Sequence, residues 1–497
     1  MLKQAFFKNI FLLIPLFLFS IEIFSQQKYW LEYNARLKDV PEIELENLKA
    51  ELKNKYQEDI SFHYESKWHP VISIETTHEI ATELSDYEWI NSITSQIELV
   101  PTSLISTNSS ELSYALEQIQ AHYLMDSMKL SGKGVNIGII DGGFMDADKE
   151  PSLLHLVEND QIKFFKDFLL AGNNNPFYGK RLAQDDHGTQ VLKMIAGSND
   201  NTIIRYGMAK NASIYLARTD HGIRERRLEE DYWIEAIELF HEMDIKLVNS
   251  SLGYTDGYDK RKENHSVNEV NGKSSMITKT AQMAAEKGML IVSAAGNDGH
   301  NKWKIISLPS DAKDVLTVGA TRFDDWSRIY YSSVGPEKLE YVKPDVACFA
   351  ANGTSFSAPV ITGLAACIWE YDSTLSNYEV MEIIKNSAHL NEVPNNYLGY
   401  GVPNGKKIHK TLLKKGLYNL SSKLIKVEVS ENDYTIQIPD GIKEIVIYHK
   451  SSDKNVKEEL TVSIESEQKF LIIEKEADIK YSTIVAQDRW LTEIMWK

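Results

Sequence analysis

Residues 352–359, with the sequence NGTSFSAP, constrain the fold most strongly, because a long apolar run follows them directly. The run from 360 to 369 is hydrophobic on nearly every face, which predicts a helix buried in the centre of a large domain. Pro359 falls within its first turn, where a missing backbone N–H costs little. Ser355 is therefore expected at a helix N-terminus, where free N–H groups favour developing negative charge. A serine that only caps a core helix is the alternative interpretation.

Apolar strand-like segments alternate with helical segments through the middle of the chain. The expected strands cover 135–140, 213–217, 245–249, 290–293 and 315–318, and the expected helices cover 231–241 and 277–286. This alternation predicts an α/β fold, a doubly wound parallel sheet with helices on both faces. Functional sites in such sheets form beyond the carboxyl ends of the strands, and Asp141 follows one of them.

The first 25 residues have the pattern of a signal peptide. Lys3 and Lys8 make the start basic, and an apolar run covers 10–19. That run is too short for a comfortable membrane span, so it predicts export to an extracellular or periplasmic location without a stable membrane span. A retained membrane anchor is the alternative.

Two further units flank the α/β region. The segment 29–33 is expected as a strand, 42–56 as a helix, 71–74 as a strand, 78–84 as a short helix and 93–100 as a final strand, which together predict a small α+β domain. A Ser/Thr/Asn-rich linker follows. Short strand-like runs separated by polar turns after about residue 421 predict an appended all-β domain, a small sandwich. The expected division is 1–25, 26–110, 111–420 and 421–497.

Composition excludes several classes of partner and scaffold. The net charge of −17 argues against a nucleic-acid partner and against adhesion to anionic membranes. The chain has two cysteines, Cys348 and Cys367, so it is not a disulfide scaffold. Two buried reduced thiols are the favoured interpretation, and a bond between them stays open because the sequence cannot supply the geometry.

Three motifs carry the residue types of a serine hydrolase. Asp141 ends a buried strand in IDGG, His187 opens a helical pattern in DHGTQV, and Ser355 lies in GTS. Serine hydrolysis needs a nucleophile, an imidazole that takes its proton, and a carboxylate that orients the imidazole. The order Asp, His, Ser differs from that of the α/β-hydrolases and from that of chymotrypsin.

The sequence resembles the subtilisin-like serine proteases, the subtilases, from about residue 112 to residue 401. Besides the three motifs, VNSSLG at 248–253 and VSAAGNDG at 292–299 match blocks of that family. The resemblance implies an endopeptidase that acts on protein or peptide substrates, with Asp141, His187 and Ser355 as the triad and Asn297 as the oxyanion donor. The implied walls of the substrate site are Ser251, Leu252, Gly253, Ala294, Ala295 and Gly296.

The resemblance also gives the N-terminal α+β unit a role. Subtilases carry a small α+β propeptide that assists folding and then blocks the active site, and residues 26–101 have the size and element order for it. The expected partner is thus the chain's own propeptide, acting as an intramolecular inhibitor. A permanently attached N-terminal domain is the alternative.

Three questions stay open at this level. A catalytically inactive subtilase fold used as a binding protein is the rival interpretation. The short connection 347–352 leaves the preference for the residue before the scissile bond undecided. The reaction is expected to need no cofactor or metal; structural calcium is an option, with oxygen ligands offered by Asp148, Glu150, Asn199 and Asp200, although solvated loop carboxylates are favoured.

Overall fold

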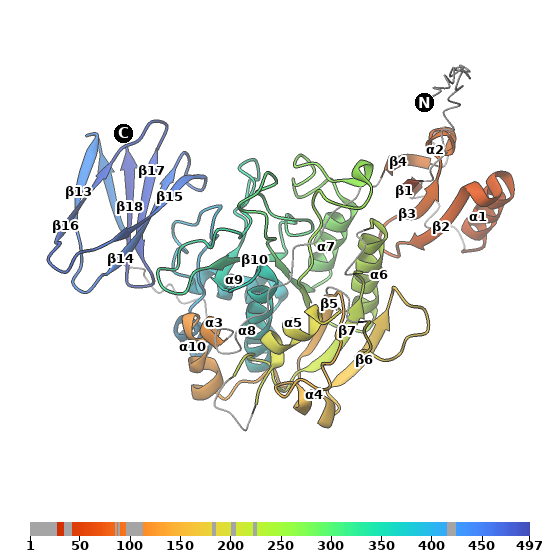
Figure 1. Ribbon diagram of the computed structural model, residues 1–497, viewed down its shortest axis with the longest axis horizontal. Helices are drawn as coiled ribbons and strands as arrows, with labels where there is room; N and C mark the ends of the chain where they lie inside the picture. The colour runs from red at the N-terminus through yellow and green to blue at the C-terminus, as the bar shows by residue number, and fades with distance from the viewer. Residues whose placement is uncertain are drawn as a thin grey trace, which may run out of the picture.

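The structure is a computed structural model. It describes residues 27–33, 42–84, 87, 90–95, 113–180, 185–199, 205–221, 226–414 and 424–497. The expected signal peptide and most of the expected linker lie outside these residues. We refer to the described parts of 27–95, 113–414 and 424–497 as the N-terminal, central and C-terminal units. Figure 1 shows the N-terminal and C-terminal units at opposite ends of the central unit.

A seven-stranded sheet forms the middle of the central unit, in the order β11-β10-β9-β8-β5-β7-β6, and all of its ladders are parallel. Its strands are β5 (Asn136–Asp141), β6 (Ile162–Asp167), β7 (Ser213–Arg218), β8 (Leu247–Ser250), β9 (Leu290–Ala294), β10 (Leu316–Thr321) and β11 (Val346–Phe349). Strand order reverses at β5, which lies between β7 and β8. The carboxyl end of β5 is therefore a topological switch point, where sites form in folds of this kind.

Helices cover both faces of this sheet. One face carries α5 (His187–Ala196), α8 (Ala358–Tyr371), α9 (Asn377–Ser387) and α10 (Gly405–Leu413), and the other carries α6 (Leu228–Glu242) and α7 (Met276–Glu286). Strand β5 shows the division, because Ile139 packs in the hydrophobic cluster of α5 and α8, whereas Ile140 packs with α6 and α7. The expected doubly wound α/β fold is confirmed. Shorter elements are α3 (Tyr114–Gln118), a π-helical turn (Tyr123–Ser127), α4 (Leu154–Glu158) and 3₁₀ turns at Arg261–Glu263 and Thr354–Phe356.

The N-terminal unit is a four-stranded antiparallel sheet in the order β2-β3-β1-β4. Its elements are β1 (Gln27–Tyr33), α1 (Glu42–Tyr56), a 3₁₀ turn (Gln57–Asp59), β2 (Ile60–Glu65), β3 (Val71–Thr76), α2 (His78–Leu84) and β4 (Ile90–Ser95). Strand β2 was not expected from the sequence, and β4 begins before the expected 93–100, whose last five residues lie outside the described part. One face of the sheet packs on α1 and α2. The opposite face sends Trp30 and Val71 into the cluster of α6 and α7.

The C-terminal unit consists of two packed sheets, as expected for an all-β domain. The larger has the order β12-β18-β17-β14-β15 and the smaller pairs β13 with β16. The strands are β12 (Leu424–Val429), β13 (Asp433–Gln437), β14 (Glu444–Lys450), β15 (Val456–Ser463), β16 (Phe470–Glu474), β17 (Tyr481–Ala486) and β18 (Trp490–Trp496). A hydrophobic cluster fills the space between the sheets. The other face of the larger sheet packs on the central unit.

Both cysteines are free and buried. Cys348 lies in β11 and donates to Ser357 O at 3.6 Å, and Cys367 lies in α8 and donates to Met208 O at 3.7 Å. Burial raises the pKa of both thiols. The favoured interpretation of two buried thiols agrees with this geometry.

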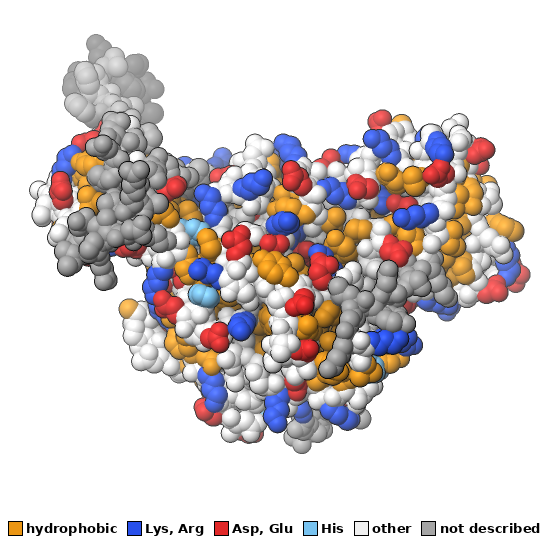
Figure 2. Space-filling view, turned by 180° about the vertical axis from the view of Figure 1, so that it is seen from behind, with side chains coloured by type: hydrophobic (Ala, Val, Ile, Leu, Met, Phe, Trp, Pro, Cys, Tyr) orange, Lys and Arg blue, Asp and Glu red, His pale blue; other side chains and the backbone are white. Residues whose placement is uncertain are grey.

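The surface carries charges of both signs. On the face shown in Figure 2, Lys and Arg side chains are interspersed with Asp and Glu side chains over the described residues. That face therefore offers no continuous basic surface. Within the described ranges, no helix combines the length and the apolar character that a membrane crossing requires.

Candidate active site

Asp141 and His187 meet at the carboxyl end of β5. The Asp141 side chain is fully buried, and its Oδ1 accepts hydrogen bonds from Gly142 N at 2.8 Å and from His187 Nδ1 at 2.7 Å. An ionised carboxylate only accepts, so Nδ1 carries the proton and Nε2 is free to act as a base. The buried Oδ2 has no hydrogen-bond partner among the described residues. Gly142, the next residue, has no side chain and so offers this oxygen no hydroxyl group.

His187 is the first residue of α5, and its side chain keeps 16% of its surface exposed. Burial lowers the pKa of His187, but the neighbouring carboxylates, chiefly that of Asp141, outweigh this effect and hold the pKa above its usual value. The ring of Phe356 lies 5.8 Å from the ring of His187, measured between centroids. The imidazole therefore lies beside the turn that carries Ser355.

Ser355 lies in the 3₁₀ turn Thr354–Phe356, one short turn before α8 begins at Ala358. The expected helix N-terminus is thus preceded by a tighter turn, and Pro359 does lie in the first turn of α8. Ser355 Oγ donates to Ser251 O at 3.1 Å, and Ser251 Oγ donates in return to Ser355 O at 2.9 Å. Among the residues that the structure describes, no hydrogen bond connects Ser355 Oγ with His187.

Asn297 lies against the same turn. Its Oδ1 accepts hydrogen bonds from Thr354 N at 2.8 Å and from Thr354 Oγ1 at 3.2 Å, which leaves Nδ2 as a donor without an acceptor in the described part of the chain. Gly353 has a φ of +133°, and a Cβ there would lie 3.3 Å from Asn297 Nδ2. Glycine thus keeps the space beside this amide open. Thr354 is not among the site residues expected from the sequence, although its place directly before Ser355 is a signal for it.

The two expected substrate walls follow neighbouring strands. Residues 251–253 follow β8, and residues 294–296 lie at the end of β9. Ser251 contacts the turn of Ser355 directly, and Gly296 N donates to Thr354 Oγ1 at 3.0 Å. Ala295 lies deeper, because its N–H donates to Val318 and its carbonyl accepts from Ser307. Ala295 therefore has no backbone group left to pair with a substrate chain, whereas its neighbours stand at the site.

The remaining wall residues are tightly held. Leu252 is 8% exposed and Ala294 is 4% exposed, so each offers only a small surface to the site. A Cβ at Gly253 would lie 2.1 Å from Ser307 Oγ, which explains the glycine at this position. These residues shape the wall through backbone position more than through side-chain volume.

Asp220 is a carboxylate near the site that the sequence reasoning did not select. It follows β7, is 4% exposed, and accepts hydrogen bonds from Thr219 Oγ1 at 2.6 Å and from Tyr254 OH at 3.2 Å. Burial raises the pKa of Asp220 to about 7, and the nearby charges of Asp141 and His187 act on it as well. Its sequence signal was weak, because an Asp after a strand is usually a loop residue.

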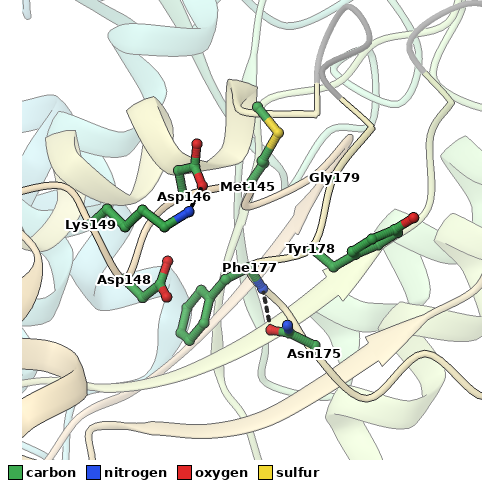
Figure 3. Close-up of a pocket in the computed structure, with 8 residues that line it drawn as sticks. All are labelled: Met145, Asp146, Asp148, Lys149, Asn175, Phe177, Tyr178 and Gly179. Carbon is green, nitrogen blue, oxygen red and sulfur yellow. Dashed lines mark hydrogen bonds and ion pairs between the residues drawn. The ribbon is translucent and has the colours of Figure 1, made fainter.

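A cavity of about 320 Å³ lies beside the loop that follows β5 (Figure 3). It is lined by Met145, Asp146, Asp148, Lys149, Asn175, Phe177, Tyr178 and Gly179. Of the suggested calcium ligands, Asp148 lines this cavity, while Glu150 is engaged by Lys193 Nζ at 3.2 Å and by Ser152 Oγ at 2.8 Å. Asp200 lies outside the described residues. Calcium binding stays a prediction.

Comparisons with known proteins agree with this architecture. The chain matches the model of the subtilase family over residues 132–401. An alkaline protease of Alkalihalobacillus alcalophilus is 24% identical over 378 residues, which make up 73% of this chain and 87% of that protein. Subtilisin DY of Bacillus licheniformis is 26% identical over 283 residues, or 55% of this chain and 90% of that protein.

A solved structure gives the same result for the fold. The epidermin leader peptide processing serine protease of Staphylococcus aureus aligns with a TM-score of 0.54 and 18% identity, over 78% of this chain and 98% of that chain. At this identity the likeness concerns the fold alone. The family match spans more than half of the chain and contains the strands, helices and turns described above. The chain therefore belongs to the subtilase family and is a subtilisin-like serine peptidase.

Proposed function

We propose that this chain is an exported serine endopeptidase that hydrolyses peptide bonds through an acyl-enzyme, with Asp141, His187 and Ser355 as its triad. The observation that carries the proposal is the 2.7 Å hydrogen bond between Asp141 Oδ1 and His187 Nδ1, formed beside the turn of Ser355. It fixes the imidazole tautomer that a general base needs. The basic and apolar N-terminal segment supports export.

The reaction requires a small movement of Ser355. Its hydroxyl donates to Ser251 O in the free site and must turn toward His187 Nε2, as catalytic hydrogen bonds often tighten only when substrate binds. Ser355 Oγ then attacks the scissile carbonyl carbon while Nε2 takes its proton, and the amine leaves with that proton as the C–N bond breaks. Water activated by the same imidazole hydrolyses the acyl-enzyme.

Asn297 is the proposed oxyanion donor. Thr354 holds its Oδ1, so that Nδ2 faces away from Thr354 and can donate to the tetrahedral oxygen together with Ser355 N–H. Losing one such donor typically lowers kcat by about 10²–10³-fold. Asn297→Ala should therefore lower kcat by that factor with little change in KM. A raised KM with an unchanged kcat would contradict this role.

The N-terminal unit is the proposed propeptide and intramolecular inhibitor. Its sheet lies against α6, where Glu238 accepts hydrogen bonds from Ser66 Oγ at 2.5 Å, from Lys67 N at 2.8 Å and from Tyr64 OH. A buried ion pair joins Lys28 to Asp231, and Ser73 Oγ donates to the same carboxylate at 2.7 Å. These contacts support a docked unit on the flank of the central sheet, with residues 96–112 as the connection to the catalytic region.

Labelling with a fluorophosphonate serine probe tests the proposed triad. The processed enzyme should be labelled at Ser355, and labelling should be lost in Ser355→Ala and in His187→Ala. His300→Ala, which removes an exposed histidine outside the triad, is the matched control and should be labelled normally. No labelling of the processed, folded protein would favour the rival function, an inactive subtilase fold that only binds its partners.

A further inference from the structure

Three potential metal ligands come together in the C-terminal unit, far in sequence from the active site. They are His449 on β14, Glu458 on β15 and Glu476, which follows β16. One ring nitrogen and one oxygen from each carboxylate all lie within 4.8 Å of one another. Among the described residues, this is the one such group of three or more histidine, cysteine or acidic side chains.

The strand register explains why the three meet. His449 and Glu458 are direct partners in the antiparallel ladder of β14 and β15, so their side chains lie on the same face of the larger sheet. That face carries Ile445 and Ile447, which pack between the two sheets. Glu476 comes from the connection that leads from the smaller sheet back to β17. The cluster therefore joins segments of both sheets.

His449 is held in the manner of a metal ligand. It is 4% exposed, and its Nδ1 shares a 2.8 Å hydrogen bond with Ser482 Oγ, which also accepts from Trp496 Nε1 at 2.8 Å. A fixed partner on one ring nitrogen orients the other toward an ion. Nε2 has no hydrogen bond within the described part of the chain, and neither Glu458 nor Glu476 forms an ion pair with it there.

The charges of the cluster also favour a cation. Two carboxylates and one imidazole nitrogen converge, and neither carboxylate forms an ion pair within the described residues. A divalent cation would balance the two negative charges, and it would accept the nitrogen lone pair at the same time.

We propose that His449, Glu458 and Glu476 bind one Zn²⁺ ion that joins the two sheets of the C-terminal unit. Zinc takes nitrogen ligands at about 2.0–2.1 Å and carboxylate oxygens at about 2.0–2.2 Å, with water in a fourth position. Calcium prefers six to eight oxygen ligands, which this set does not provide. Glu458 is half-buried and Glu476 is exposed, so both side chains can close on the ion.

Zinc binding to the full-length Ser355→Ala protein tests the proposal, because that variant cannot cleave itself. After treatment with a chelator and dialysis, the protein should bind one equivalent of Zn²⁺ in calorimetry that Glu476→Gln and Glu458→Gln each abolish. Glu467→Gln, an exposed carboxylate on the connection between β15 and β16, is the matched control and should bind normally. Zinc bound elsewhere, for example at His187, is unaffected by these changes.

A second measurement distinguishes the loss of a zinc site from a variant that simply folds poorly. Zinc should raise the Tm of the parent and of Glu467→Gln but not that of Glu476→Gln, whose exposed side chain contributes little to folding by itself. His449→Gln, which keeps most of the side-chain volume, should behave like Glu476→Gln. Equal zinc binding by the parent and Glu476→Gln would overturn the proposal, as would calcium binding at this cluster with the affinity of zinc.

Discussion

The two units that flank the central sheet are attached by different chemistry. The N-terminal unit meets the central unit through polar contacts as well as through the apolar side chains of Trp30 and Val71. Its polar contacts go to two carboxylates on α6, since Asp231 and Glu238 accept hydrogen bonds and an ion pair from it. The C-terminal unit meets the central unit through a hydrophobic cluster, in which Tyr448 and Val485 pack against Leu390 and Leu398.

The two units therefore differ in the kind of surface that the central unit exposes when each is removed. Carboxylates on α6 regain water when the N-terminal unit departs, which offsets the exposure of the apolar surface that Trp30 and Val71 cover. The apolar side chains under the larger C-terminal sheet gain nothing from contact with water. Exposing them costs roughly 25 cal/mol per Å². The first interface is suited to a unit that leaves, as proposed for a propeptide, and the second to a unit that stays.

Removal of the C-terminal unit should have the largest effect. A chain that ends at residue 420 uncovers the cluster of Val334, Leu390 and Leu398, and we expect loss of soluble, folded protein. The soluble fraction and the rate of hydrolysis of a short peptide measure this. A truncated enzyme that stays soluble and cleaves the peptide at the full-length rate would make the C-terminal unit an accessory module instead.

Removal of the N-terminal unit by cleavage of the folded precursor should leave an active enzyme. The purified active protein should begin between about residues 102 and 112, whereas Ser355→Ala should accumulate as a precursor that begins near Gln26. N-terminal sequencing of both proteins checks this. If Ser355→Ala is trimmed at the same place in a host without other proteases, self-cleavage is wrong; if the active enzyme keeps the unit attached, the propeptide role is wrong.

The C-terminal interface should respond to pH through Glu459. Burial raises its pKa to about 7 from an ordinary value of 4.5, although Arg328 N donates to it at 2.8 Å. A carboxyl with a raised folded pKa adds stability that is complete below pH 4.5 and is lost as pH rises through 7. As pH rises through that range, Glu459→Gln should therefore become more stable relative to its parent, by about 3 kcal/mol at most.

Thermal unfolding from pH 4.5 to 8 in the Ser355→Ala background measures this difference. Glu444→Gln, an exposed carboxylate on the same sheet, is the control. A difference between Glu459→Gln and its parent that does not change with pH would exclude the proposed linkage.

The N-terminal interface should depend on Glu238 more than on Glu242. Glu238→Ala leaves the buried hydroxyl of Ser66 and the part-buried N–H of Lys67 without their acceptor, which costs about 1–3 kcal/mol. The separate N-terminal unit should then inhibit the processed enzyme roughly tenfold to a hundredfold more weakly. Glu242→Ala removes only an exposed pair with Lys67 and should change inhibition by about fivefold or less. Equal effects would show that the polar contacts do not hold this unit.

The periodic signals of the sequence predicted the central fold well. The strand expected at 135–140 is β5 (Asn136–Asp141), and the helix expected after Pro359 is α8. These elements are buried on both faces, so their apolar runs are long and distinct. Strand β2 is absent from the expected elements, although its sequence carries the signal of a strand, because Ile60, Phe62 and Tyr64 alternate with polar residues.

Contacts between distant segments could not be predicted in this way. The pairing of Asp141 with His187 was expected from ordered motifs, but the hydrogen bond from Ser355 Oγ to Ser251 O was not. Asp220 is buried beside Tyr254, which lies in the segment after β8 and donates a hydrogen bond to it. Such environments arise from tertiary packing, which leaves no local pattern around the aspartate.

The buried thiols of Cys348 and Cys367 have a practical consequence. Alkylating and oxidising reagents attack the thiolate, and neither side chain reaches solvent or ionises readily near neutral pH. In the folded protein both thiols should therefore resist oxidation and alkylation, and the protein has no disulfide between them for a reductant to break. A maleimide that reacts with either cysteine would report that β11 or α8 has opened. The rate of this reaction would therefore measure the rate at which the central unit unfolds.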